Sequence, residues 1–196
     1  MFIELAEYLM CPVPHAEQSH CIVVPDTMER RMVLAGVVGC PVCKAQYPIS
    51  DGTVWFGDPP SVAAAAAPLP EATVVQALFN LSGPGGYVVL LGTAAGLADE
   101  LGSLVEGVGM VAVNPVRGAV TGAGVSRIAT ADRIPLAPQM ARAVVAGEEF
   151  VTAAWLGECV RVLLPGLRLV AFGAVSGPPG VEELAVGDGL WVGVKR

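Results

Sequence analysis

The feature that most constrains the fold is an alternation of short apolar runs and helical stripes beyond residue 70. The run YVVLL, residues 87–91, is apolar throughout and has the length of a buried strand. A helical stripe follows at 97–105, and the apolar run MVAVN comes next at 110–114. The same reasoning predicts helices at 71–83 and 152–164 and strands at 124–129, 142–146, 167–172 and 190–194. Repeated strand–helix–strand units predict an α/β domain, a reduced doubly wound and largely parallel sheet with both faces covered.

One of these predicted helices also indicates the role of a cysteine. In TAAWLGECVRVLL, helical spacing puts five apolar side chains on one face: Trp155, Leu156, Cys159, Val160 and Leu163. Glu158 and Arg161 are expected on the outside of the helix. Cys159 is therefore predicted to be a core residue and not a ligand or nucleophile.

The other four cysteines gather with both histidines in the first 45 residues. Cys40-Pro-Val-Cys43 has the spacing of a zinc knuckle, and Cys11-Pro-Val-Pro-His15 sets a thiol and an imidazole four positions apart. We predict a zinc site of Cys11, His15, Cys40 and Cys43. Cys21, which begins the apolar run CIVV, is the alternative to His15, and core cysteines without metal are the remaining interpretation.

The residues around these cysteines are predicted to form a small β-meander. Strands are expected at 21–25, 31–38 and 46–56, with the segment PDTMER at 25–30 as the first turn. A unit of about 50 residues has too small a core to fold reliably alone, so a metal cross-link would supply stability.

Two phrases in this region resemble a known family. LAEYLMCP and GCPVCKAQYPISDGTVWF are similar to the small zinc-ribbon family that includes the activator subunit of tRNA and ribosome methyltransferases. The resemblance covers residues 1–57. It implies a structural, protein-binding module in which zinc does no chemistry, and His15 departs from the second cysteine that many relatives carry.

The segment DPPSVAAAAAPLP, residues 58–70, separates this region from the remainder. Its prolines favour a semi-rigid connector over a helix. We therefore expect a zinc-ribbon domain at 1–57, a linker at 58–70 and a second domain at 71–196.

Four phrases of the second domain resemble class I S-adenosylmethionine-dependent methyltransferases, and they occur in the family's order: VVLLGTAAGLADEL, MVAVNP, ATADRIPLA and LGECVRVLLPGLRLVAFG. The resemblance implies a Rossmann-like fold with S-adenosylmethionine as cofactor. It places Gly92 and Gly96 in the glycine-rich turn and Asn114 at the ribose-binding position.

The cofactor contacts that the resemblance implies are mostly replaced. Ala94 stands at the middle position of the glycine turn, and Asn114 replaces a carboxylate. The remaining positions of the family's pattern hold Leu90, Thr130 and the pair Ala141-Arg142. Since each charge-assisted contact contributes roughly 1.5–3 kcal/mol, we expect cofactor affinity to be poor or absent.

No other catalytic set is expected. Both histidines belong to the ribbon, so no Ser-His-Asp or Cys-His arrangement is available. Asp99 and Glu100 fall in the first turn of a helix, where the macrodipole accounts for them. Glu148 and Glu149 are expected at a solvated loop end, and a base in a cleft is the alternative.

Charge and hydropathy limit the partners. The net charge of −7 provides no basic field for a nucleic acid, so none is expected to bind directly. Gly or Pro interrupts every apolar run before it reaches membrane-spanning length. The acidic N-terminus and the cysteine usage favour a cytoplasmic location.

Two functions follow for the whole chain. The first is a noncatalytic methyltransferase-like scaffold or accessory subunit that contacts other proteins in a larger assembly, because ionisable side chains are sparse between residues 59 and 128. Peripheral association with a membrane complex stays open. The alternative is an active methyltransferase with an atypical cofactor pocket.

Overall fold

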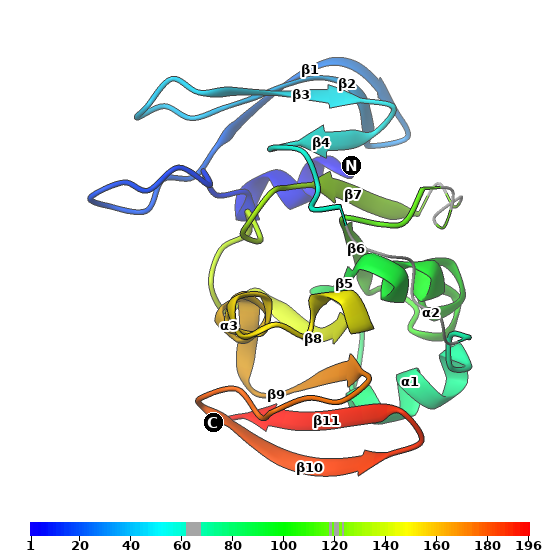
Figure 1. The fold of residues 1–196 in the computed structure, drawn as a ribbon. Coiled ribbons are helices and arrows are strands. Elements are labelled where there is room, and N and C mark those ends of the chain that lie inside the picture. Colours follow the sequence, from blue (N-terminus) through cyan, green and yellow to red (C-terminus); the bar gives the residue numbers. More distant parts are fainter. Residues whose placement is uncertain (62–67, 118, 120–121, 123) are drawn as a thin grey trace.

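The N-terminal part is a β-meander preceded by a 3-10 helix. The computed structural model describes residues 1–61, 68–117, 119, 122 and 124–196, so residues 62–67 of the expected linker lie outside the described residues. The elements of this part are η1 (Ile3–Tyr8), β1 (Ile22–Glu29), β2 (Met32–Gly39), β3 (Gln46–Ser50) and β4 (Thr53–Trp55). The four strands pair antiparallel in chain order and form one end of the molecule (Figure 1).

The first turn lies further along the chain than predicted. Residues 25–30 are not a turn, because β1 continues to Glu29 and pairs with β2 through an irregular register after Pro25. The chain reverses at Arg30 and Arg31, whose φ angles of 44° and 71° are left-handed.

The centre of the molecule is a parallel sheet, as predicted. Its strands are β5 (Tyr87–Leu91), β6 (Gly109–Val113), β7 (Val125–Ala129), β8 (Ala141–Ala146) and β9 (Leu163–Phe172). They are parallel and lie in the order β7-β6-β5-β8-β9. A C-terminal hairpin of β10 (Val181–Gly187) and β11 (Leu190–Lys195) adds β11 antiparallel to β9, and β10 was not predicted.

The N-terminal strands belong to the same sheet. The predicted strand 46–56 is two strands, because Asp51 and Gly52 form a tight turn with φ angles of 49° and 74°. The second, β4, pairs parallel with β7, with Thr53 opposite Arg127. Among the described residues the sheet therefore has eleven strands, in the order β1-β2-β3-β4-β7-β6-β5-β8-β9-β11-β10.

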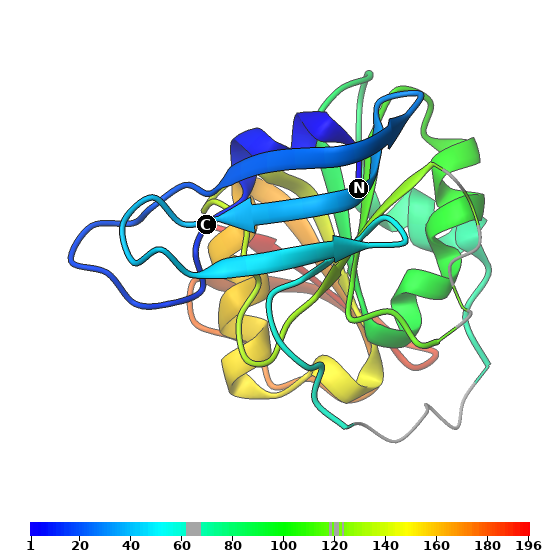
Figure 2. The same cartoon turned by 90° about the horizontal axis from the view of Figure 1, so that it is seen from above.

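Both faces of the central strands are covered. The helices are α1 (Ala72–Phe79), α2 (Ala98–Leu104) and α3 (Ala153–Val162), with 3-10 turns η2 (Gly92–Leu97) and η3 (Glu148–Phe150). Since side chains alternate along a strand, Val88 of β5 packs with α1 and α2, whereas Val89 packs with α3. Figures 1 and 2 show α3 on the opposite side of the sheet from α1 and α2.

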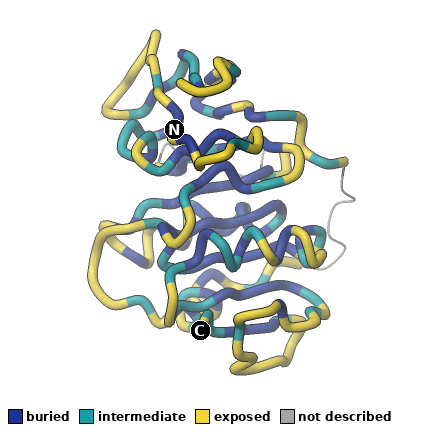
Figure 3. The backbone as a smooth tube through the Cα atoms, turned by 90° about the vertical axis from the view of Figure 1, so that its left-hand side faces the viewer, coloured by how far each residue is buried: buried dark blue, intermediate teal, exposed yellow. Residues whose placement is uncertain are grey.

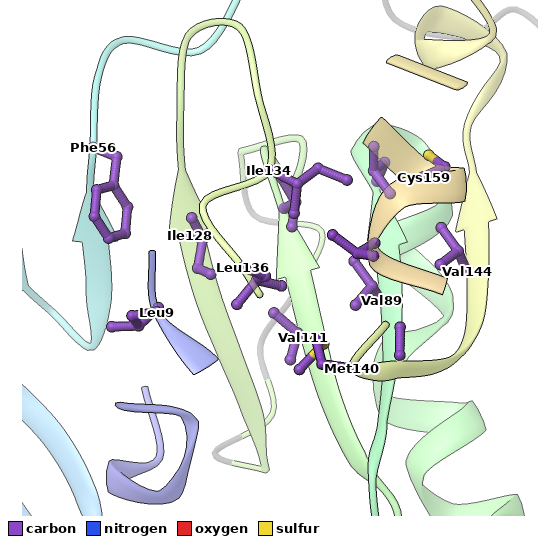
Figure 4. Close-up of a cluster of buried hydrophobic side chains, with 14 of the residues drawn as sticks. Leu9, Phe56, Val89, Val111, Ile128, Ile134, Leu136, Met140, Val144 and Cys159 are labelled. Carbon is purple, nitrogen blue, oxygen red and sulfur yellow. The ribbon is translucent and has the colours of Figure 1, made fainter. Parts of the chain in front are cut away.

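One core runs from the N-terminal part to α3. Leu9 and Phe56 contribute to the same buried cluster as Leu136 and Cys159 (Figure 4). Cys159 has no exposed surface, which confirms that it is a core residue. The central strands are buried and the connecting loops are exposed (Figure 3). No helix within the described ranges is long and apolar enough to cross a membrane.

Candidate metal centre and the carboxyl edge of the sheet

Two separate stretches of the N-terminal part meet at one cluster of soft ligands. Cys11 and His15 lie in the segment after η1, and Cys40 and Cys43 lie in the turn between β2 and β3. The turn is closed by the Lys44 amide, which donates to the Cys40 carbonyl at 3.1 Å. The ligand atoms of these four residues all lie within 4.8 Å of one another, so the group could hold a metal ion.

The spacing fits a tetrahedral zinc ion. Zn–S bonds of about 2.3 Å and Zn–N bonds of about 2.0–2.1 Å place two sulfurs about 3.8 Å apart and a sulfur and a nitrogen about 3.5 Å apart. The Sγ atoms of Cys11 and Cys43 are 3.8 Å apart, and the Cys40 Sγ is 3.4 Å from the His15 Nε2. Three thiols and one imidazole are also a donor set that zinc prefers in closed structural sites.

The surroundings of Cys40 lower the pKa of its thiol. Burial raises the pKa of Cys40, but hydrogen bonds from the backbone amides of Cys43 and Val42 and with the Ser19 hydroxyl outweigh it and lower that pKa to about 6. Burial raises the pKa of Cys11. A thiolate at Cys40 is the form that a metal ion takes up.

Cys21, the alternative ligand, lies outside the group of four. Its side chain is buried, and burial together with the neighbouring thiols raises its pKa to about 12. The Cys21 amide donates to the Leu9 carbonyl, which ties the start of the meander to the N-terminal segment. The geometry thus brings His15, and not Cys21, to the other three residues.

The positions that the methyltransferase resemblance singled out lie at the carboxyl edge of the parallel strands. Gly92 directly follows β5, and its φ of +60° is left-handed. Gly96 is at the end of η2, and Asn114 follows β6. The Asn114 side chain is buried and both of its polar atoms are paired, because its Nδ2 donates to the Thr130 carbonyl at 2.9 Å and its Oδ1 accepts from the Thr130 amide at 2.8 Å.

The space over the glycine turn is filled by the chain itself. The Thr93 amide donates to Glu149 Oε1 at 2.5 Å, and the Thr93 hydroxyl donates to Oε2 at 2.9 Å. A Cβ at Gly92 would overlap the Glu149 carboxylate and the Phe150 ring. The prediction of a solvated loop end was therefore wrong for Glu149, although Glu148 beside it is exposed.

The pair Ala141-Arg142 does not lie where the methyltransferase resemblance placed it. It is at the start of β8, away from the carboxyl edge, so it is not the residue pair that follows the fourth parallel strand. The Arg142 guanidinium instead donates to the carbonyls of the loop 82–85. The residues that do follow β8 are Gly147, Glu148 and Glu149.

Glu158 and Arg161 were expected outside α3, and that was wrong. Both are half-buried and paired, with 2.7 Å between Arg161 Nη2 and Glu158 Oε2. They hold the connection between β7 and β8: the Ile134 amide donates to Glu158 at 2.9 Å, and Arg161 donates to the Leu136 carbonyl at 2.8 Å. Helical spacing could not show this, because the loop that covers the helix is distant in sequence.

A cavity of about 450 Å³ lies beside this edge. Its wall includes Thr93, Glu148, Phe172 and Asp188. The cavity is therefore next to the Glu149–Thr93 contact.

Comparison with protein-family models and with curated proteins gave no match. Among solved structures, a chain of the complex between the Haloferax volcanii Trm112 methyltransferase activator and its partner methyltransferase is 24% identical, with 51% of this chain and 50% of that chain covered and a TM-score of 0.41. The chain thus spans half the length of that protein. A protein from Methanococcus maripaludis, assigned as an S-adenosylmethionine-dependent methyltransferase, gives a TM-score of 0.47 at 14% identity, covering 64% and 83%.

The antibiotic-resistance methyltransferase Kmr is a third similar structure. It gives a TM-score of 0.44 at 13% identity, and the match covers 66% of this chain and 95% of that chain.

Proposed function

We propose that the chain is a noncatalytic, zinc-binding, methyltransferase-like scaffold or accessory subunit that acts through protein–protein contacts. Strand order supports the methyltransferase-like assignment. Counted from β5, the strands lie in the order 3-2-1-4-5-7-6 with the last strand antiparallel, which is the order of the class I methyltransferase fold. The part 3-2-1-4-5 is shared with doubly wound nucleotide-binding sheets.

The observation that carries the noncatalytic assignment is the Glu149 carboxylate on Thr93. A nucleotide-type cofactor binds against the glycine turn and needs backbone amides of that turn that are free to donate hydrogen bonds. Here the Thr93 amide and hydroxyl are both satisfied by Glu149, and the Phe150 ring lies against Gly92. A cofactor at this turn would have to displace a charge-assisted pair of hydrogen bonds, which costs several kcal/mol.

Asn114 supports the same assignment. A ribose needs a side-chain acceptor that is free to take two hydroxyl donors. Both polar atoms of the Asn114 amide are already paired with the Thr130 backbone. Gly96 is also closed off on one side, since a Cβ there would lie 2.9 Å from Leu69 Cδ1.

The zinc site has a structural role in this proposal. Four protein ligands, Cys11, His15, Cys40 and Cys43, would complete the coordination of the ion and leave no open position for a reacting water. The ion would join the N-terminal segment to the β2–β3 turn, and so stabilise the meander whose β4 covers the edge strand β7.

Exposed apolar side chains on the two outer strands support a protein partner. Ile22 and Val24 on β1 are each 58% exposed, and Val186 on β10 is 64% exposed. Both strands are edges of the sheet, with unpaired backbone groups. Cross-linking followed by mass spectrometry of the complex purified from its source tests this, because contacts should map to β1 or β10.

An active methyltransferase with an atypical pocket is the second candidate. The cavity of about 450 Å³ beside Thr93 and Glu148 favours it, because ligand sites of open α/β sheets lie outside the carboxyl ends of the strands. In that case the cofactor would bind beside the Glu149–Thr93 contact and not over Gly92.

Isothermal titration of the zinc-loaded chain with S-adenosylmethionine separates the two candidates. The scaffold proposal expects no binding at about millimolar ligand. It also expects Glu149→Ala to create weak binding by freeing the Thr93 amide, whereas Glu182→Ala on the distant β10 should change nothing. Micromolar binding to the unchanged chain would support the enzyme and overturn the scaffold.

A further inference from the structure

A small cavity lies beside the candidate metal centre, where the N-terminal part meets α3. It has a volume of about 200 Å³. One part of its wall comes from residues 10–19, which follow η1 and include Cys11 and His15. The other part comes from Arg133 of the β7–β8 connection and Arg161 of α3. Among the described residues, the other two members of the zinc group do not line it, so the cavity lies next to the metal ligands and not between them.

The wall of this cavity carries positive charge in a protein whose net charge is −7. Arg133 and Arg161 are half-buried, with side-chain exposures of 30% and 20%, and none of the described lining residues is acidic. Both guanidiniums share the Glu158 carboxylate, whose Oε2 lies 2.7 Å from Arg161 Nη2 and 3.8 Å from Arg133 Nε. Within this group of three, one positive charge is therefore left without a partner.

The two arginines differ in the donors that they still have free. Arg161 donates through Nε and Nη2 to Glu158, and through Nη1 and Nη2 to carbonyls of the β7–β8 connection. Arg133 donates no hydrogen bond from its Nη atoms to the described part of the chain, and its Nε is too far from Glu158 for one. A guanidinium with free donors can form two parallel hydrogen bonds with a planar carboxylate.

His15 provides a second donor at this cavity when zinc is bound. Its Nε2 faces the metal group, at 3.4 Å from the Cys40 Sγ. Zinc on Nε2 leaves the proton on Nδ1, and Nδ1 has no hydrogen-bond partner among the residues that the structure describes. Metal-bound histidines almost always donate this second N–H to a carboxylate, a carbonyl or a water. A carboxylate in the cavity that His15 borders would supply such an acceptor.

We propose that this cavity binds a carboxylate, either of a small metabolite or of an acidic side chain of a partner protein. The carboxylate accepts from the Nη atoms of Arg133 and from the Nδ1–H of His15. The proposal rests on the zinc site of the proposed function, because zinc fixes the position of the histidine proton. A singly charged carboxylate is favoured over a doubly charged phosphate, since three thiolates around Zn²⁺ keep one net negative charge beside the cavity.

Histidine NMR on the full zinc-loaded chain tests the proposal, because the protein has two histidines and only His15 is among the described lining residues. With 15N-labelled imidazoles at constant pH and ionic strength, propanoate should shift the His15 Nδ1 signal saturably, with a dissociation constant of about 5 mM. His20, which is exposed and outside the described wall, is the internal control and should not move. Equal shifts of both histidines, or no saturable shift up to about 100 mM, would overturn the proposal.

Arginine variants separate a specific site from a general effect of charge. Arg133→Gln should weaken propanoate binding about fivefold, because it removes both the charge and the free donors. Arg133→Lys keeps the charge without the pair of parallel donors and should weaken binding about twofold. Arg30→Gln is the matched control, since it removes an equal charge at the other end of β2 from Cys40, and it should leave the affinity unchanged. Equal weakening by Arg133→Gln and Arg30→Gln would contradict a site at Arg133.

Elemental analysis of the same samples separates this proposal from that of the zinc site. A chain that holds zinc but shows no His15 response refutes the carboxylate site alone, whereas a chain without zinc refutes the metal centre and the carboxylate site with it. His15→Cys offers a four-cysteine zinc site without an imidazole donor, so it should keep the ion. Isothermal titration should show propanoate binding to this variant weakened about threefold, and unchanged binding would contradict the role of His15.

The choice of probe identifies the source of the carboxylate. Propanoate represents a free metabolite, and Nα-acetyl-glutamate α-methylamide represents an acidic side chain in a protein. Tighter binding of the first indicates a metabolite, and tighter binding of the second indicates a protein partner. Propanamide has the same shape without the charge, and inorganic phosphate is mostly a dianion at about pH 8. If either of these binds as tightly as propanoate, the proposal fails.

Discussion

Replacing Glu158 with alanine removes the acid that holds the β7–β8 connection against α3. Its carboxylate accepts from Arg161 Nε at 2.9 Å and Nη2 at 2.7 Å and from the Ile134 amide at 2.9 Å. Removing one member of a buried ion pair costs about 3–5 kcal/mol. Because the Glu158 and Arg161 side chains keep exposures of 18% and 20%, we expect the lower end, a loss of about 3 kcal/mol in the free energy of unfolding.

Urea unfolding followed by tryptophan fluorescence measures this loss, and Glu182→Ala is the control. Glu182 pairs with Arg196 at 2.9 Å, but the two side chains are 49% and 70% exposed. Such a pair is screened by solvent and contributes about 0.5 kcal/mol or less. Equal losses in Glu158→Ala and Glu182→Ala would refute the reasoning, since they would show that burial of the first pair adds nothing.

Other substitutions test further contacts. Cys43→Ala should lower the zinc content from one ion per chain to near zero by elemental analysis, whereas Cys21→Ala should keep the ion; loss of zinc in both would contradict the ligand assignment. Arg142→Ala should speed amide hydrogen exchange in the loop 82–85, which loses its guanidinium donor, and unchanged exchange would count against this role. Cys159→Ser should lower the urea midpoint by the equivalent of about 2 kcal/mol, because a hydroxyl replaces a thiol with no exposed surface; an unchanged midpoint would show that the site accepts a polar atom.

The parallel core was predictable from sequence because its strands are buried on both faces. The run YVVLL of β5 is apolar throughout, which is typical of a strand buried on both faces. The strand lies in the structure where it was expected. VEELAVG of β10 was missed because this edge strand is almost wholly exposed and carries acids. The turn at 25–30 was misplaced because Pro25 and Asp26 are typical turn residues, and pairing with β2 overrides that preference.

The candidate sites differ in whether their residues lie close together in the sequence. The four residues of the zinc group fall in two short motifs, so spacing indicated them, although it left Cys21 as the alternative to His15. The Glu149–Thr93 contact joins residues 56 positions apart, and it exists because β5 and β8 pair in a register that sets Gly147 beside the end of β5. No local pattern carries that register, which is why Glu149 was expected in solvent.

The Thr93 backbone amide offers the most direct test that the glycine turn is closed to cofactor. In 15N-labelled protein its resonance should be shifted downfield by the short bond to Glu149, and Glu149→Ala should remove that shift. Titration of the unchanged chain with S-adenosylmethionine is expected to leave the resonance in place at about millimolar ligand. A saturable shift of the Thr93 amide in the micromolar range would contradict the account, because it would show that the cofactor displaces the carboxylate.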